Sequence, residues 1–116
     1  MKSETETKAL KTVPREKAFY FFTSIGNYTG ESASSLKEFM EKINIVNIKS
    51  LEFHLYRGDF EKWTAEVLED KTLAEEISKL RLSNLSGNIL REKLYNMVAK
   101  RLKELIKLQF DKSSQP

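Results

Sequence analysis

The fold is decided by one stretch, Phe53-His54-Leu55-Tyr56-Arg57-Gly58-Asp59-Phe60-Glu61-Lys62-Trp63, because it predicts two consecutive helices and the break between them. Glycine is the usual residue just after the C-terminus of a helix, so we expect Gly58 to end the first helix. We predict that helix over residues 51–57, with Ser50 as its N-cap. Asp59 is a favourable N-cap for the second helix, and Phe60 and Trp63 begin its buried stripe.

Helical periodicity continues on both sides of this stretch. Apolar residues at spacings of three and four predict a helix over residues 32–43. Asp70 and Thr72 mark the start of another helix, and a long amphipathic stripe predicts a final one over residues 88–110. We therefore predict an all-α fold, a compact bundle of about five helices with a long C-terminal helix.

The length of the chain, 116 residues, favours one domain with its own core. Residues 1–12 are polar and lack periodicity, and residues 112–116 form a short tail. We predict flexible segments over both ranges and a single helical domain over residues 13–111.

The aromatic run from Phe19 to Phe22 is harder to assign. Its propensity favours a strand. A lone strand would leave its backbone donors and acceptors unpaired, and the rest of the chain offers no convincing second strand. We therefore expect a short helix or an irregular buried segment, followed by a turn or loop over residues 26–30. Aromatic rings can also stack on nucleic-acid bases, but in so small a domain core packing is the expected role.

Composition excludes several kinds of site. The chain has no cysteine and a single histidine, His54, which excludes disulfides, zinc–thiolate centres and a multi-histidine metal site within one chain. We predict no metal and no cofactor. Apolar runs are too short for a membrane span, and the polar N-terminus does not resemble a signal peptide, so we expect a cytoplasmic protein that does not bind a membrane. Its richness in Lys, Glu and Ile is typical of thermophilic proteins.

Four residues of the central stretch could form a site: His54, Arg57, Asp59 and Trp63. In a catalytic interpretation His54 is a general base oriented by Asp59, and Arg57 holds an anion. In a structural interpretation Asp59 caps its helix, Arg57 pairs with an acidic neighbour and His54 packs on Trp63. The structural interpretation is favoured, because the sequence offers no nucleophile or metal site beside them. We therefore predict no catalytic residue and no enzymatic activity.

Charge is unevenly distributed along the chain. The formal net charge is +3, but residues 88–116 carry seven basic and three acidic side chains. The basic face of the final helix could contact nucleic-acid phosphates, or it could simply be a solvated surface. The candidate phosphate contacts are Arg91, Lys93, Lys100, Arg101, Lys103 and Lys107.

Two segments resemble a known family. One runs from Phe22-Thr23-Ser24-Ile25-Gly26-Asn27-Tyr28-Thr29-Gly30 to Ala33-Ser34-Ser35-Leu36-Lys37-Glu38-Phe39. The other is the His-x-x-Arg-Gly-Asp-Phe-x-x-Trp pattern that starts at His54, with Leu68, Asp70, Leu73 and Ala74 after it. Together they are similar to DUF5752, a family of small archaeal and bacterial domains of unknown function. In that pattern a glycine often precedes the aspartate, whereas this chain has Glu69. The resemblance implies a compact domain and brings no activity, cofactor or catalytic residues.

The sequence favours a non-catalytic protein-interaction or regulatory module whose partner is another protein. The alternative is a nucleic-acid-associated protein that uses the basic face of the C-terminal helix. A third, enzymatic hypothesis requires His54 and Asp59 to lie in one concave pocket that solvent can reach.

Overall fold

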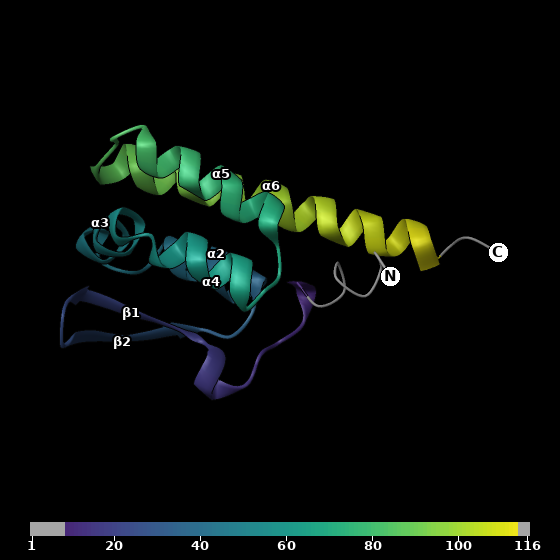
Figure 1. Ribbon diagram of the computed structural model, residues 1–116, viewed down its shortest axis with the longest axis horizontal. Helices are drawn as coiled ribbons and strands as arrows, with labels where there is room; N and C mark the ends of the chain where they lie inside the picture. The colour runs from purple at the N-terminus through teal and green to yellow at the C-terminus, as the bar shows by residue number, and fades with distance from the viewer. Residues whose placement is uncertain (1–8, 114–116) are drawn as a thin grey trace.

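The computed structural model describes residues 9–113 and contains one β-hairpin and five α-helices within that range (Figure 1). The elements, in chain order, are the 3₁₀-helix η1 (Arg15–Lys17), β1 (Phe19–Ser24), β2 (Asn27–Ala33), α2 (Leu36–Ile43), α3 (Ile48–Arg57), α4 (Asp59–Glu66), α5 (Lys71–Leu82) and α6 (Gly87–Ser113). The predicted all-α class is therefore wrong, and the domain is α+β.

The aromatic run predicted as a helix or irregular segment is strand β1. It pairs antiparallel with β2, in the register Phe19↔Ala33, Tyr20↔Ser32, Phe22↔Tyr28 and Ser24↔Asn27, with two irregularities. The second strand escaped prediction because its sequence, NYTGESA, shows no alternation of apolar residues and stays largely exposed. The predicted loop over residues 26–30 is also wrong, because only Ile25 and Gly26 form the turn and the rest belongs to β2.

The N-terminus of α2 lies four residues later than predicted, since Ala33 belongs to the hairpin. Ser35 caps the helix, and its hydroxyl accepts a hydrogen bond from the Glu38 amide. In contrast, α3 begins earlier than predicted. Asn47 caps it, and Ser50, the predicted cap, is buried within the helix.

Gly58 ends α3 as predicted, with a left-handed φ of 82°. The predicted capping role of Asp59 is wrong, because Asp59 is the first residue of α4 and Gly58 occupies the cap position without a side chain. Asp70 caps α5 by accepting a hydrogen bond from the Leu73 amide. The final helix, α6, is slightly longer than predicted at both ends.

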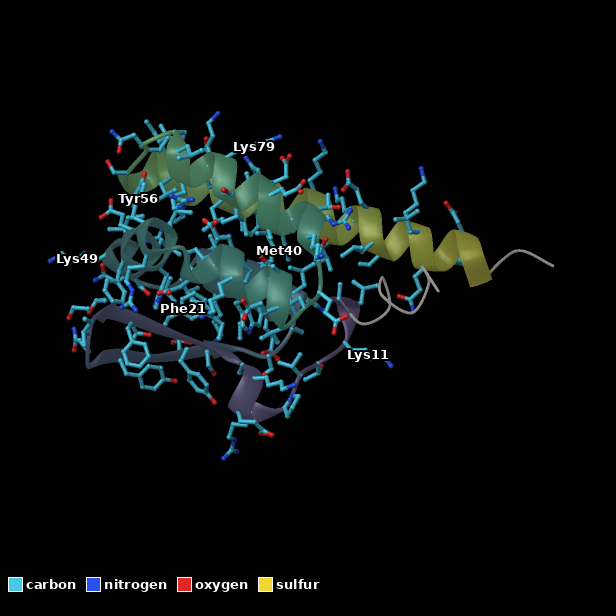
Figure 2. All side chains as sticks on the ribbon, in the orientation of Figure 1. Lys11, Phe21, Met40, Lys49, Tyr56 and Lys79 are labelled. Carbon is cyan, nitrogen blue, oxygen red and sulfur yellow. The ribbon has the colours of Figure 1, made fainter. Side chains whose placement is uncertain are left out.

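The elements form three layers (Figure 1). The hairpin packs on α2 and α3, and these helices with α4 form the middle layer, while α5 and α6 cover its other side. Phe21, fully buried, lies between the hairpin and the helices, whereas Lys49 and Lys79 point away from the molecule (Figure 2). The core continues to Ala9, which is 1% exposed. Most of the two segments predicted to be flexible, residues 1–8 and 114–116, lies outside the described residues.

None of the helices within residues 9–113 combines the length and the apolar character that a membrane span requires.

Candidate functional site

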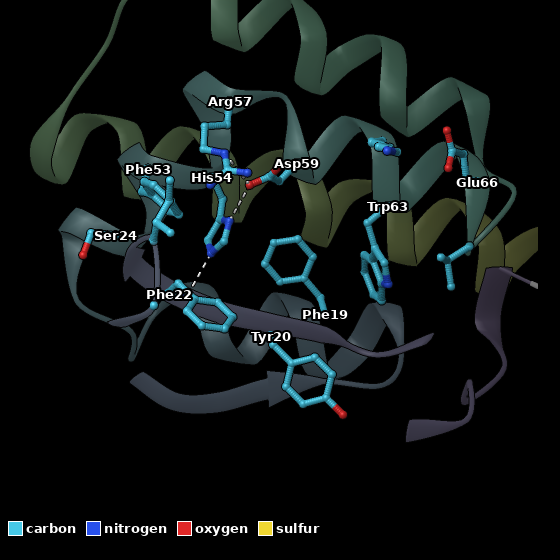
Figure 3. Close-up of a pocket in the computed structure, with 14 residues that line it drawn as sticks. Phe19, Tyr20, Phe22, Ser24, Phe53, His54, Arg57, Asp59, Trp63 and Glu66 are labelled. Atoms are coloured by element: carbon cyan, nitrogen blue, oxygen red, sulfur yellow. Dashed lines mark hydrogen bonds and ion pairs between the residues drawn. The ribbon is translucent and has the colours of Figure 1, made fainter. Parts of the chain in front are cut away.

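A pocket of about 560 Å³ lies between the hairpin and the helices α3 and α4 (Figure 3). One wall comes from β1 and the turn after it, and the opposite wall comes from the two helices that meet at Gly58. The lining is rich in aromatic rings and includes four charged side chains. Its aromatic members are Phe19, Tyr20, Phe22, Phe53 and Trp63, and its charged members are Arg57, Asp59, Lys62 and Glu66.

His54 lies in the wall of this pocket and is only 4% exposed. Its Nε2 atom accepts a hydrogen bond from the backbone N–H of Phe22 at 2.8 Å, and its Nδ1 atom lies 2.8 Å from Oδ2 of Asp59 (Figure 3). A backbone N–H can only donate, so Nε2 must carry the lone pair. The ring proton is therefore on Nδ1 and is donated to Asp59. These two bonds connect β1, α3 and α4 through one side chain.

Burial lowers the pKa of His54 below its ordinary value of 6.5, because the buried ring has lost the hydration that stabilises its charged form. The hydrogen bond and the charge of Asp59 act in the opposite direction, and the positive charge of Arg57 lowers the pKa further. Burial has the largest effect, so His54 is neutral at neutral pH. A neutral imidazole is the form that can accept the Phe22 hydrogen bond.

The rings around His54 differ from the prediction, which placed Trp63 there. Five phenylalanines surround the imidazole, with centroids 4.7–6.4 Å away: Phe19, Phe21, Phe22, Phe53 and Phe60. Trp63 packs on Phe19 and Phe39 instead, and its indole N–H donates to the carbonyl of Lys17 at 2.8 Å. It is 7% exposed and forms one end of the pocket. Trp63 thus makes a second connection between the N-terminal segment and α4.

Arg57 is the most accessible member of the predicted cluster. Its guanidinium lies 4.7 Å from the ring centre of Phe53, in cation–π geometry, and its Nε atom is 3.5 Å from Oδ2 of Asp59. The same oxygen atom of Asp59, Oδ2, therefore contacts both His54 and Arg57. All four residues predicted from the sequence, His54, Arg57, Asp59 and Trp63, line the same pocket.

The hairpin wall is the part of the site that the sequence prediction missed. Along β1, Phe19 and Phe21 are buried in the core, while Tyr20 and Phe22 are half-buried. All four side chains are aromatic, so the sequence itself shows no such pattern. The two-residue repeat of a strand with one face in the core produces it. It would have placed Tyr20 and Phe22 at the surface if the strand had been recognised.

The predicted phosphate contacts on α6 separate into two groups. Arg91 donates to the carbonyl oxygens of Ile43 and Asn44 at the end of α2. Arg101 forms two hydrogen bonds with the buried carboxylate of Asp70, at 2.8 and 2.9 Å. Both arginines are thus engaged within the fold. The four lysines are exposed: Lys93, Lys100, Lys103 and Lys107.

The fold and the pocket together define a small α+β domain in which a β-hairpin and a pair of helices enclose an aromatic site. Residues 15–116 match the model of the Family of unknown function (DUF5752), and the chain belongs to that family, as its sequence resemblance predicted. The matched region contains η1, the hairpin and all five described α-helices. No curated protein and no solved structure matches the chain.

Proposed function

We propose that this domain is a non-catalytic interaction module that binds a segment of another protein in the pocket between the hairpin and helices α3 and α4. The observation that carries this proposal is the open aromatic pocket, whose floor and walls are already assembled by the fold. Protein interfaces commonly combine an aromatic centre with a polar rim. Here Tyr20, Phe22 and Phe53 supply partly accessible rings, while Lys62 and Glu66 supply exposed charges of opposite sign.

The state of His54 supports binding over catalysis. A general base needs a lone pair that can reach the substrate proton. The lone pair of Nε2 is already used by the Phe22 amide, and the ring is almost inaccessible. Asp59 orients the imidazole as the enzymatic hypothesis requires, but the proton-accepting atom points at the backbone of β1 instead of the open pocket.

The test is a selection of peptides from a random phage-displayed library, followed by titration of the selected peptides into the protein. Trp63 is the only tryptophan of the chain and lines the pocket, so its fluorescence reports binding directly. We expect Phe53→Ser to weaken peptide binding by more than about 1 kcal/mol, as the loss of a central aromatic contact does. Ile89→Ser, on the exposed surface of α6, is the control and should bind normally. Peptides that bind wild type and Phe53→Ser equally would contradict the proposal.

A second candidate function rests on the lysines of α6. At 100° per residue, Lys93, Lys100, Lys103 and Lys107 share an arc of about 80° and span about 21 Å along the helix axis. No described residue forms an ion pair with any of the four. Such a stripe could bind nucleic-acid phosphates without reading sequence. Fluorescence anisotropy with labelled DNA and RNA tests this, and binding should weaken with salt and with Lys100→Ala, Lys103→Ala and Lys107→Ala combined.

A further inference from the structure

We propose that His54 is a pH-sensitive latch that holds β1 against α3, so that mild acidification loosens the hairpin wall of the pocket. The hairpin and the helices are joined at this point by one titratable side chain, through the bond from the Phe22 amide to Nε2. The regulation of partner binding by this latch rests on the proposed function, whereas the latch itself can be observed without any partner.

The geometry makes the bond depend on protonation. A protonated imidazole carries a hydrogen on each nitrogen, and both atoms then only donate. Nε2 would face the Phe22 N–H, a second donor, across 2.8 Å. The other nitrogen cannot relieve this conflict, because Nδ1 is held by Asp59. Protonation therefore replaces a hydrogen bond with a repulsive contact between two donors, and β1 must move away from α3 or admit water.

The charged groups around His54 define how strongly it resists protonation. From its own helix, Arg57 opposes the charged form, while Asp59 from α4 favours it. Lys62 and Glu66 follow along the pocket side of α4, and β1 contributes the Tyr20 hydroxyl to the same pocket. The buried position of the ring adds the largest resistance. The latch is therefore closed at neutral pH and opens at a pH below 6.5, the ordinary value for histidine.

Opening changes the pocket because the residues that would move form its wall. Tyr20 and Phe22 line the pocket from β1. The Phe22 amide that binds His54 lies between these two side chains along the strand. The bond from the Trp63 indole to the Lys17 carbonyl lies before the strand and contains no titratable group. We expect this second connection to persist, so that the hairpin loosens near its turn while its base stays attached.

The experiment is an NMR pH titration of the protein alone, from about pH 7.5 downward until the His54 ring signals stop shifting. His54 is the only histidine and Trp63 the only tryptophan, so both ring signals are assigned without mutation. We expect the His54 ring to titrate below 6.5, its ordinary value, and hydrogen-exchange protection of the Phe22 amide to fall with the same midpoint. The expected loss is about tenfold, which corresponds to one hydrogen bond. The Trp63 indole and the Leu94 amide in the core of α6 should keep the chemical shifts of the folded domain throughout.

Two outcomes would overturn the latch. In one, Phe22 protection is constant through the titration of His54. In the other, the Leu94 amide loses its folded-state chemical shift at the same midpoint, which indicates unfolding of the whole domain. His54→Gln should remove the transition, because its side-chain carbonyl can accept the Phe22 bond and does not titrate.

Asp59→Asn provides an independent test if His54→Gln does not fold. The asparagine oxygen still accepts from Nδ1, but it lacks the charge that favours the imidazolium, so the transition should move to lower pH. A midpoint that stays the same or rises contradicts the proposal.

A working latch in a protein that selects no peptides would contradict only the proposed function. Peptide binding without a Phe22 transition would contradict only the latch.

Discussion

Arg101 and Asp70 form a two-point ion pair between α6 and the start of α5, in which the Asp70 side chain is only 2% exposed and the Arg101 side chain 18% exposed. The same carboxylate accepts a hydrogen bond from the Leu73 amide and so caps α5. A single side chain thus starts one helix and attaches it to another. Such a bidentate pair depends on the planar guanidinium and is not reproduced by lysine.

We expect Arg101→Ala to destabilise the protein by about 3 kcal/mol, because it leaves a buried carboxylate without its counter-charge. Urea denaturation followed by circular dichroism measures the free energy of unfolding. The neighbouring Lys100→Ala removes an exposed positive charge and serves as the control, with an expected change within about 0.5 kcal/mol. Equal stability of the two variants would show that the pair contributes little.

The stability of the domain should fall on mild acidification because of His54. Its pKa is lowered in the folded state by burial, so at pH values between the folded value and 6.5 the unfolded chain holds more protons. The contribution is complete above pH 6.5 and is lost as the pH falls through the folded pKa. The free energy of unfolding, measured by urea at several pH values, should decrease more steeply in wild type than in His54→Gln. Parallel curves for the two proteins would rule this out.

Glu69 is expected to be a weak point of the α4–α5 connection, because its backbone has a φ of +56°. This is the left-handed region, which costs a side-chain-bearing residue about 1–2 kcal/mol and costs glycine little. The greater freedom of glycine in the unfolded chain offsets part of the gain. We therefore expect Glu69→Gly to raise stability by about 0.5–1 kcal/mol.

The matched control for that substitution is Glu75→Gly. Glu75 is exposed within α5, where glycine lowers stability by about 1 kcal/mol. The two variants make the same chemical change and should shift the thermal midpoint in opposite directions. A lower midpoint for both would mean that backbone strain at Glu69 is unimportant.

The N-terminus of α6 is stabilised from another helix. The Glu52 carboxylate of α3 accepts a hydrogen bond from the Gly87 amide at 2.9 Å. A carboxylate at this position both caps a free amide and interacts favourably with the helix dipole. We expect Glu52→Ala to cost about 1 kcal/mol, measured by urea denaturation, whereas Glu92→Ala on the exposed side of α6 should have little effect. If Glu52→Ala is as stable as wild type, water replaces the carboxylate without loss.

The helices were predictable because their signals are local. Gly58 and Asp70 act within a few residues, and their roles as helix end and helix cap follow from φ preference and side-chain geometry. The hairpin was not predictable in the same way, because β2 has little apolar pattern and is specified by its pairing with β1. A second strand was rejected on local pattern alone, although the aromatic run over residues 19–22 has the propensity of a first strand.

The candidate site was predictable as a set of residues but not as an arrangement. His54, Arg57, Asp59 and Trp63 were identified because they are close in sequence, and they do share one pocket. The decisive contact, from the Phe22 amide to Nε2, joins residues 32 positions apart and involves a backbone atom. No side-chain pattern reveals such a bond. Arg101 is a second example. The sequence predicted it as a phosphate contact, but its guanidinium donates two hydrogen bonds to Asp70, 31 positions away.

The three-layer arrangement has a consequence for how binding can be measured. The pocket is lined by the hairpin and the helices α3 and α4, with no residue from α6. The helix α6 lies on the side of the α2–α4 layer that faces away from the hairpin (Figure 1). A peptide in the pocket and a polyanion along α6 would therefore not compete for space. If both bind, the domain can join two macromolecules at once, and a competition assay would miss that bridging altogether. A ternary complex detected by mass photometry or ultracentrifugation would reveal it.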